Sequence, residues 1–425
     1  MHFHERLARY QALPKFSTDT KKAAALRKEA RTSRFQQCRA RAAEPCMSDW
    51  LRVLNSAAEE TVLEQTFEQV LLHTQTIPLA ALPEFTRVAL SLASSTSSRL
   101  QDSVQSFLQS IAAGLSRGSL EELVLGLKQG RIDNLFVLCV VTSNRNDLRN
   151  DLVQAGSLEW LQTLDQEFSC LQVVQCAAWL GLNCSHECRH FSADRVDGLF
   201  ELVLNLFGYE DESTDLDCLG VLLNLSQHFP DLLLASSCMR HLARALHSAQ
   251  PAYLCLAVQI LRFACQFSCE RALAALPGVG PVLQALDSAC LGVRHEAMRV
   301  LRLVAVHAEE HLIDRAVLER FVLDGSVKTE ALQILQVLSG KQPVGLIREG
   351  ILELLARRLQ AASEAPEVTE LLTSVYKLVA GALAQGCSAA TLYERAASAG
   401  LLQQVTSQLN CSRQLALACL GLLSN

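Results

Sequence analysis

The chain of 425 residues is too long for one compact core, because such cores stop growing at about 250–300 residues. Half of its residues are hydrophobic but only 5% are aromatic, and 10 Pro and 20 Gly are too few for a turn-rich all-β chain. Composition therefore favours helices, arranged either in several domains or in a repeat array.

The formal net charge of −6 is unevenly distributed along the chain. Residues 1–45 hold eleven Lys and Arg against four acidic residues, a balance of +7, so the rest of the chain carries −13. A basic arm on an acidic body is typical of a segment that docks on an acidic partner or folds back on its own body.

The sequence predicts a protein of the cytoplasm and nucleus. The N-terminal segment MHFHERLARY lacks the apolar core of a signal peptide. The longest uncharged stretch, between Glu167 and Glu187, is too polar for a span of ~20 apolar residues, so we expect no transmembrane helix and no membrane partner. The sixteen Cys lie mostly in apolar helical windows, as Cys139 and Cys218 do, and are expected to be reduced and buried.

In chain order, residues 46–120 predict helices with an apolar stripe, interrupted by a polar loop over residues 94–98. From about residue 120 onward, helical segments recur in which Gly precedes apolar residues at helical spacing. These glycines are Gly156, Gly198, Gly278, Gly350 and Gly400. Two further segments are expected to start near Cys238 and Leu318.

Each of these segments is followed by a second, longer apolar helix in which one polar position recurs. The occupants of this position are Asn144, Asn183, Asn224, Arg262, Arg302 and Gln336. The successive steps between them are 39, 41, 38, 40 and 34, and a period near 40 is typical of armadillo and HEAT repeats. The predicted fold is all-α, a right-handed α-solenoid of armadillo-type repeats over residues 46–425 that follows a basic arm over residues 1–45. The last helix of each repeat is expected to line a concave binding surface.

The best candidates for a binding groove lie on these second helices. Trp179 and Asn183 are four residues apart and share a helix face. In a groove, the indole packs on the stem of a Lys or Arg and the Asn amide bonds the backbone of an extended peptide. The alternative is that Trp179 is buried between repeats and Asn183 caps its helix. Asn144 and Asn224, at the equivalent position, favour the groove.

Further along, Arg262 and Arg302 take the same position, so the groove is expected to become basic there unless both are solvated surface residues. The densest acidic run, from Tyr209 to Asp217, is expected to be a loop that either receives a basic peptide or is merely solvated. We include Asp217 among the groove candidates.

Neither a metal site nor an enzyme is predicted. The Cys and His residues between Cys184 and His190 have ligand-type side chains, but structural zinc sites usually pair two separated half-sites. The sequence contains no phosphate-binding loop, dinucleotide fingerprint, nucleophile elbow or zinc-protease motif. We therefore expect no cofactor, and the acidic body argues against nucleic acid as a partner.

Residues 6–41 carry a family resemblance. They run from Arg6-Leu7 through an aromatic residue and a basic pair to Leu26-Arg27-Lys28 and a final basic cluster. This segment resembles the importin-β-binding segment that precedes the armadillo repeats of the importin-α (karyopherin-α) family. The sequence CAAWLGLN, which contains Trp179 and Asn183, is similar to the Trp-x-x-x-Asn repeat core of that family.

The resemblance implies a nuclear import adaptor, whose arm recruits importin-β and whose groove binds a basic cargo peptide. The arm residues that it implies are Lys21, Lys22, Leu26, Arg27, Lys28, Arg31, Arg39 and Arg41. The chain departs from the family pattern because the first basic cluster is reduced to two Lys and because Arg262 and Arg302 would repel a basic peptide. The alternative is an armadillo scaffold or regulatory protein without transport activity, which binds one dedicated partner. An acidic partner would suit the region of Arg262 and Arg302.

Overall fold

The computed structural model describes residues 47–56, 59–93, 97–163, 170–186, 188–209, 211–276, 278–307, 328–410 and 412–424. In these ranges the regular elements are helices and no strand occurs. The chain divides into two compact units, residues 1–221 and 222–425, which are described separately. The basic arm predicted over residues 1–45 lies outside the described residues.

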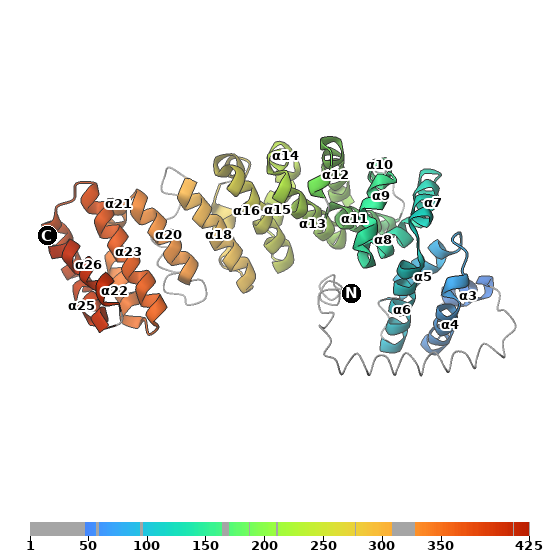
Figure 1. Ribbon diagram of the computed structural model, residues 1–425, viewed down its shortest axis with the longest axis horizontal. Coiled ribbons are helices and arrows are strands. Elements are labelled where there is room, and N and C mark those ends of the chain that lie inside the picture. Colours follow the sequence, from blue (N-terminus) through green and yellow to red (C-terminus); the bar gives the residue numbers. More distant parts are fainter. Residues whose placement is uncertain are drawn as a thin grey trace. The chain divides into compact units, whose positions relative to one another are not determined.

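The first unit consists of helices in two layers (Figure 1). Helices α4, α6, α8 and α11 pack successively against one another, and α7, α9, α10 and α12 form the second layer. The helices are α3 (Met47–Asn55), α4 (Glu60–Leu72), α5 (Leu82–Leu92), α6 (Ser98–Gly114), α7 (Arg117–Lys128), α8 (Asn134–Asn144), α9 (Arg149–Gln154), α10 (Ser157–Gln162), α11 (Leu171–Ser185), α12 (Ala193–Leu206) and α13 (Glu212–His228), which crosses into the second unit. Short 3-10 turns occur at Thr74–Thr76, Asn146–Leu148, Cys188–His190 and Phe207–Tyr209.

Helix α8 shows how the composition produces this packing. Its residues from Asn134 to Thr142 are all buried, and the helix contacts α5, α6, α7 and α11. A helix that is apolar on every side can be stable only when other elements surround it. Aliphatic side chains fill the narrow spaces between closely packed helices, so the core needs few aromatic residues.

Residues 94–96 of the predicted polar loop lie outside the described residues, and Ser98, expected in that loop, is the first residue of α6. Ser97 caps this helix, and its hydroxyl accepts a hydrogen bond of 3.2 Å from the backbone nitrogen of Leu100. Such a cap satisfies one of the four backbone donors that a helix start leaves open.

Most of the glycines predicted to start helical segments lie at helix junctions. Gly156 (φ 91°), Gly350 (φ 85°) and Gly400 (φ 72°) directly precede α10, α22 and α25. At Gly156 and Gly350, the left-handed backbone conformation lets one helix end and the next begin. A residue with a side chain would be strained in this conformation. Gly198 lies inside α12, the helix that covers the segment predicted around it, and its missing side chain leaves room for Gln162.

The acidic run predicted as a loop is mostly helical. Asp211 accepts hydrogen bonds from the backbone nitrogen (2.9 Å) and the hydroxyl (2.8 Å) of Thr214, and α13 begins at Glu212. Asp215 and Asp217 therefore lie within the helix, and Asp217 is 3% exposed. Acidic side chains in the first turn are stabilised by the positive end of the helix dipole, so a dense acidic run can begin a helix.

In the second unit, the long helices α16, α18, α20, α23 and α26 pack side by side in this order (Figure 1). Helix α15 packs on α17, and α22 packs on α24 and α25, to form the other layer. The bounds are α14 (Pro230–Ala235), α15 (Cys238–Leu246), α16 (Pro251–Ala274), α17 (Gly280–Ala285), α18 (Leu291–His307), α20 (Lys328–Lys341), α21 (Pro343–Arg348), α22 (Ile351–Ala361), α23 (Ala365–Ala384), α24 (Ala389–Ser398), α25 (Leu401–Ser407) and α26 (Arg413–Ser424), with a 3-10 turn at Gln408–Asn410. The segment expected near Cys238 is α15, and the one expected near Leu318 lies outside the described residues.

Helix α16 is long and apolar enough to cross a membrane by length and composition alone. Its backbone leaves the helical region at Ser268 (φ −154°, ψ 100°), and it packs against α14, α15 and α18. Nine of its residues are buried, among them Leu254, Ile260 and Leu261. These contacts place α16 in the core of the second unit, where a long apolar helix is equally expected.

The six polar positions predicted as equivalent occur on α8, α11, α13, α16, α18 and α20. The spacing of these positions thus follows the succession of long helices along the chain. Those helices carry the predicted binding residues.

Candidate functional site

In the first unit, the predicted groove residues Asn183 and Asn144 use their amides within the protein. Asn183, on α11, is 6% exposed and donates hydrogen bonds to the hydroxyls of Thr142 (3.2 Å) and Ser143 (2.9 Å) on α8. Asn144 is exposed at the end of α8, and its amide donates to the carbonyl oxygen of Val140 at 2.7 Å. The amide of Asn183 therefore connects α11 to α8.

The other candidates of this group differ in exposure. Trp179 is half-buried on α11, one turn before Asn183, whereas Asp217 is buried in α13. Asn224 is half-buried and belongs to the second unit. Of these candidates in the first unit, Asn144 and part of Trp179 are open to a bound segment.

The cysteines of α8 and α11 are buried, as the sequence predicted. The thiol of Cys139 donates to the carbonyl oxygen of Cys176 at 3.0 Å, and burial raises the pKa of Cys139 well above its usual range. Burial also raises the pKa of Cys184 to about 12. These thiols stay protonated near neutral pH and pack as small hydrophobic groups.

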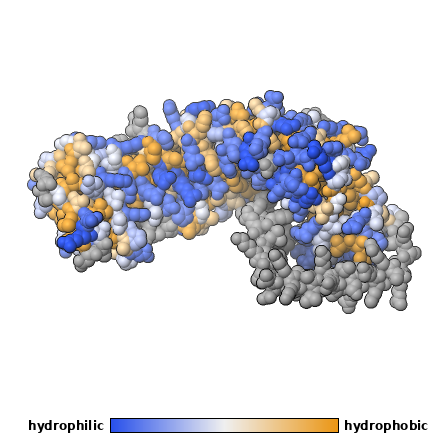
Figure 2. Space-filling model, viewed as in Figure 1, coloured by the Kyte–Doolittle hydropathy of each residue, from blue (hydrophilic) through white to orange (hydrophobic). Residues whose placement is uncertain are grey.

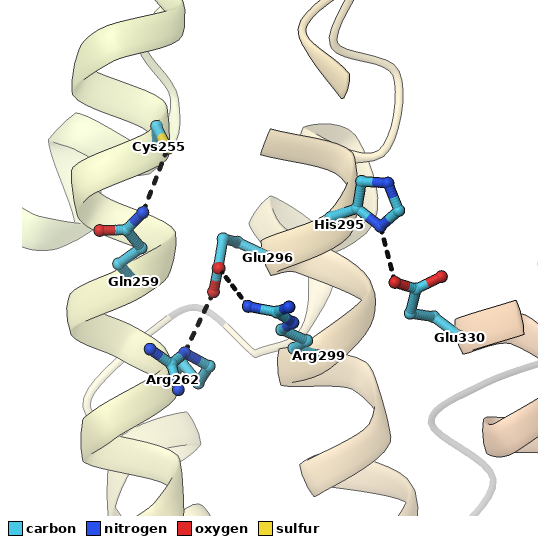
Figure 3. Close-up of polar contacts among 7 residues, drawn as sticks. All are labelled: Cys255, Gln259, Arg262, His295, Glu296, Arg299 and Glu330. Atoms are coloured by element: carbon cyan, nitrogen blue, oxygen red, sulfur yellow. Dashed lines mark hydrogen bonds and ion pairs between the residues drawn. The ribbon is translucent and has the colours of Figure 1, made fainter. Parts of the chain in front are cut away.

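The second unit presents a different arrangement, in which long polar side chains extend between α16, α18 and α20 (Figure 3). Glu296 of α18 is 12% exposed and lies between two arginines. The Nε of Arg262 is 3.0 Å from its Oε2, and the Nη1 of Arg299 is 2.7 Å from its Oε1. The Arg262 guanidinium also lies 4.3 Å from the ring centroid of Phe263. Arg262 is therefore held by contacts and is not a freely solvated residue.

Arg302, one turn beyond Arg299, is exposed and donates to the amide oxygen of Gln333 on α20 at 2.7 Å. Nearby, the Nδ1 of His295 and the Oε1 of Glu330 are 2.6 Å apart. Arg302 thus bonds a neutral partner, and among the described residues no carboxylate lies within ion-pair distance of it.

These side chains surround a hollow of about 360 Å³, with Met298 and Leu303 as its apolar part. We call it the arginine groove. Its polar lining is Arg262, Gln266, Arg299, Arg302, Glu330 and Gln333. Figure 2 shows hydrophilic residues gathered over this part of the second unit, with hydrophobic residues between them.

The sequence identified Arg262 and Arg302 in this region but missed the residues that complete the groove. Glu296, Arg299 and Arg302 follow one another at intervals of three residues on one side of α18. This spacing was visible in the sequence, and it predicts a common helix face. The contacts with Arg262 and Gln333 depend on how neighbouring helices pack, and no local pattern contains them.

All of the predicted arm residues, from Lys21 to Arg41, lie outside the described residues. In the part of the chain that is described, no group of three or more His, Cys, Asp or Glu side chains converges as a metal site would require.

No family model and no curated protein matches this sequence. The fold is similar to that in a crystal structure of an engineered protein, with a TM-score of 0.58 and 17% sequence identity over 89% of this chain and 99% of that chain. At this identity, the likeness concerns the fold, and function has to be argued from the site.

Proposed function

We propose that this chain is a protein-binding scaffold whose second unit holds an extended segment of a partner protein in the arginine groove. The observation that carries the proposal is that long polar side chains from three neighbouring long helices, α16, α18 and α20, line one hollow. The sequence pattern had independently selected Arg262 and Arg302 as binding residues on these helices.

The spacing of the helices suits an extended ligand. Packed helices lie about 8–10 Å apart, and an extended chain advances about 3.3 Å per residue. Each helix can therefore contact every third residue of a bound segment. Gln266 and Gln333 supply both donors and acceptors for its backbone, while the arginines supply donors in a planar fork.

Position-specific photo-cross-linking tests this proposal. A photoreactive residue is placed at Gln266 or Gln333 in the groove, or at Arg348, which is exposed on helix α21 and does not line the groove. We expect both groove positions, but not Arg348, to capture the same protein in cells. Capture from all three positions alike, or from none, would contradict a binding role for the groove.

A nuclear import adaptor is the second candidate, and the +7 charge of residues 1–45 favours it. In this hypothesis the arm recruits importin-β, a basic cargo peptide occupies the groove around Asn144 and Trp179, and the protein moves between cytoplasm and nucleus. The test is direct binding of the purified chain to importin-β, before and after Arg27, Lys28, Arg39 and Arg41 are changed to Ala. Loss of importin-β binding in the variant would support the adaptor hypothesis. If the intact chain does not bind importin-β, the adaptor hypothesis is wrong and the scaffold hypothesis remains.

A further inference from the structure

We infer that the arginine groove selects an acidic segment, an extended peptide whose Asp and Glu carboxylates pair with Arg299 and Arg302. This inference rests on the proposed function and specifies the chemistry of the partner. It is the opposite of the basic cargo that the family resemblance implies.

The first argument is the supply of carboxylates to the arginines of the groove. Glu296 serves both Arg262 and Arg299, and Glu330 is occupied by His295. The guanidinium has five donors, and one shared carboxylate cannot satisfy those of two arginines. The side chain of Arg299 is 53% exposed, so its remaining donors face solvent.

The second argument is the arrangement of the exposed cations. Arg299 and Arg302 are three residues apart on α18 and therefore lie on one face of the helix. Arg302 bonds the neutral Gln333 of α20, and the exposed Lys377 of α23 donates to the neutral Gln336 of α20 at 3.1 Å. Arg299 shares the carboxylate of Glu296 with Arg262, whereas the partners of Arg302 and Lys377 are amides, and this arrangement leaves a positive potential that attracts anionic ligands.

The third argument is that a carboxylate is the group these donors fit. Arginine binds carboxylates through two parallel hydrogen bonds, and such charge-assisted bonds are about twice as strong as neutral ones. A lysine-rich segment would place like charges beside Arg299 and Arg302 in a hollow that is partly shielded from water. Repulsion of this kind is a common source of specificity in binding sites.

Apolar side chains lie among the arginines of the groove. Met298 and Leu303 form the apolar part of its lining. An apolar residue within the acidic segment can pack on this part of the groove. We therefore expect the preferred segment to combine Asp or Glu with Leu or Phe.

The test uses three short fluorescein-labelled peptides of equal length that alternate Leu and Ser with Glu, Gln or Lys. Fluorescence anisotropy measures their affinity for the full chain at low and physiological salt. We expect the Glu peptide to bind at least about tenfold more tightly than the Gln peptide, and the preference to shrink as salt rises. The double variant Arg299→Ala, Arg302→Ala is expected to lose this preference.

A matched control removes two exposed arginines elsewhere in the second unit. Arg240→Ala with Arg348→Ala lowers the net charge equally, on α15 and α21, and is expected to keep the preference for Glu. The charge-reversed variant Arg299→Glu, Arg302→Glu is expected to prefer the Lys peptide. This reversal is a gain of binding, which a misfolded protein cannot show.

The outcomes separate this inference from the proposed function. Equal binding of the Glu and Gln peptides, both weakened by the groove variant, would overturn the acidic preference and retain the scaffold. A phosphoserine peptide that binds far more tightly than the Glu peptide would replace the carboxylate site with a phosphate site. If no peptide binds, the inference is wrong, and the cross-linking from Gln266 and Gln333 then decides whether the scaffold survives.

Discussion

In the first unit the long helices α8 and α11 meet through small polar side chains, whereas in the second unit α16, α18 and α20 meet through long charged ones. Asn183 is buried, and its amide reaches the hydroxyls of the neighbouring helix. Arg302, at the equivalent repeat position, is exposed and spans the gap to Gln333. One position of the repeat can thus either join neighbouring helices or present a charge to solvent, and side-chain length decides which.

The difference has an energetic reason. A small buried amide that is fully hydrogen-bonded costs little entropy and connects two helices. A long arginine keeps its head in water while its stem covers apolar surface, so it contributes less to packing but remains available to a ligand. We therefore expect substitutions in the first unit to change stability and substitutions in the arginine groove to change binding.

The largest expected effect concerns thiol reactivity. Burial raises the pKa of Cys184 from 9.0 to about 12. At pH 8 this lowers the fraction of the thiol present as thiolate by about a thousandfold, and each pH unit above 8 raises that fraction only about tenfold. Iodoacetamide at pH 8 is expected to spare Cys184 and to modify the half-exposed Cys290 of the second unit, as mass spectrometry can show. Rapid modification of Cys184 in the folded chain would mean that the first unit is open where the structure shows it closed.

The next effect is on packing. Phe136 is 1% exposed in α8, and Phe136→Ala is expected to lower the free energy of unfolding by about 3–5 kcal/mol, because it leaves a cavity. Phe267→Ala in α16 removes the same ring from a site that is 52% exposed and is expected to cost less than about 0.5 kcal/mol. Urea denaturation of both variants measures the two free energies of unfolding. Equal losses of stability would contradict the burial of Phe136 and the exposure of Phe267.

A smaller effect is expected at the repeat position itself. Asn183→Ala removes the hydrogen bonds to Thr142 and Ser143 and is expected to cost about 1–3 kcal/mol. Arg302→Ala is expected to change stability by less than about 0.5 kcal/mol, since the side chain is exposed. Thermal melting compares the two, and a larger loss for Arg302→Ala would show that the groove is structural.

The last effect combines stability with binding and is predicted for Glu296→Gln. The amide oxygen can still accept the hydrogen bond from Arg299, so the expected loss of stability is only about 1 kcal/mol. At the same time the groove loses a carboxylate that competes with the ligand, and affinity for the Glu peptide is expected to rise severalfold. Weaker binding of that peptide, measured by anisotropy, would mean that Glu296 positions the arginines more than it neutralises them.

Much of the architecture was predictable from local patterns. The apolar periodicity and the sparse Gly and Pro predicted helices throughout, and the regular recurrence of one polar position located it on six long helices. The acidic run at residues 211–217 is helical and not the predicted loop, because Asp211 accepts two hydrogen bonds from Thr214 and so caps the start of α13.

The sequence by itself determined the helical class and the positions of the polar residues on the long helices, because helix formation depends on residues that are near one another in sequence. Only the tertiary structure decided what those residues contact. Asn183 meets Thr142 from 41 residues away, and Arg262 meets Glu296 across the interface of two helices. Such pairs form because apolar faces bury against each other and bring distant polar groups together, and no short-range pattern specifies their geometry.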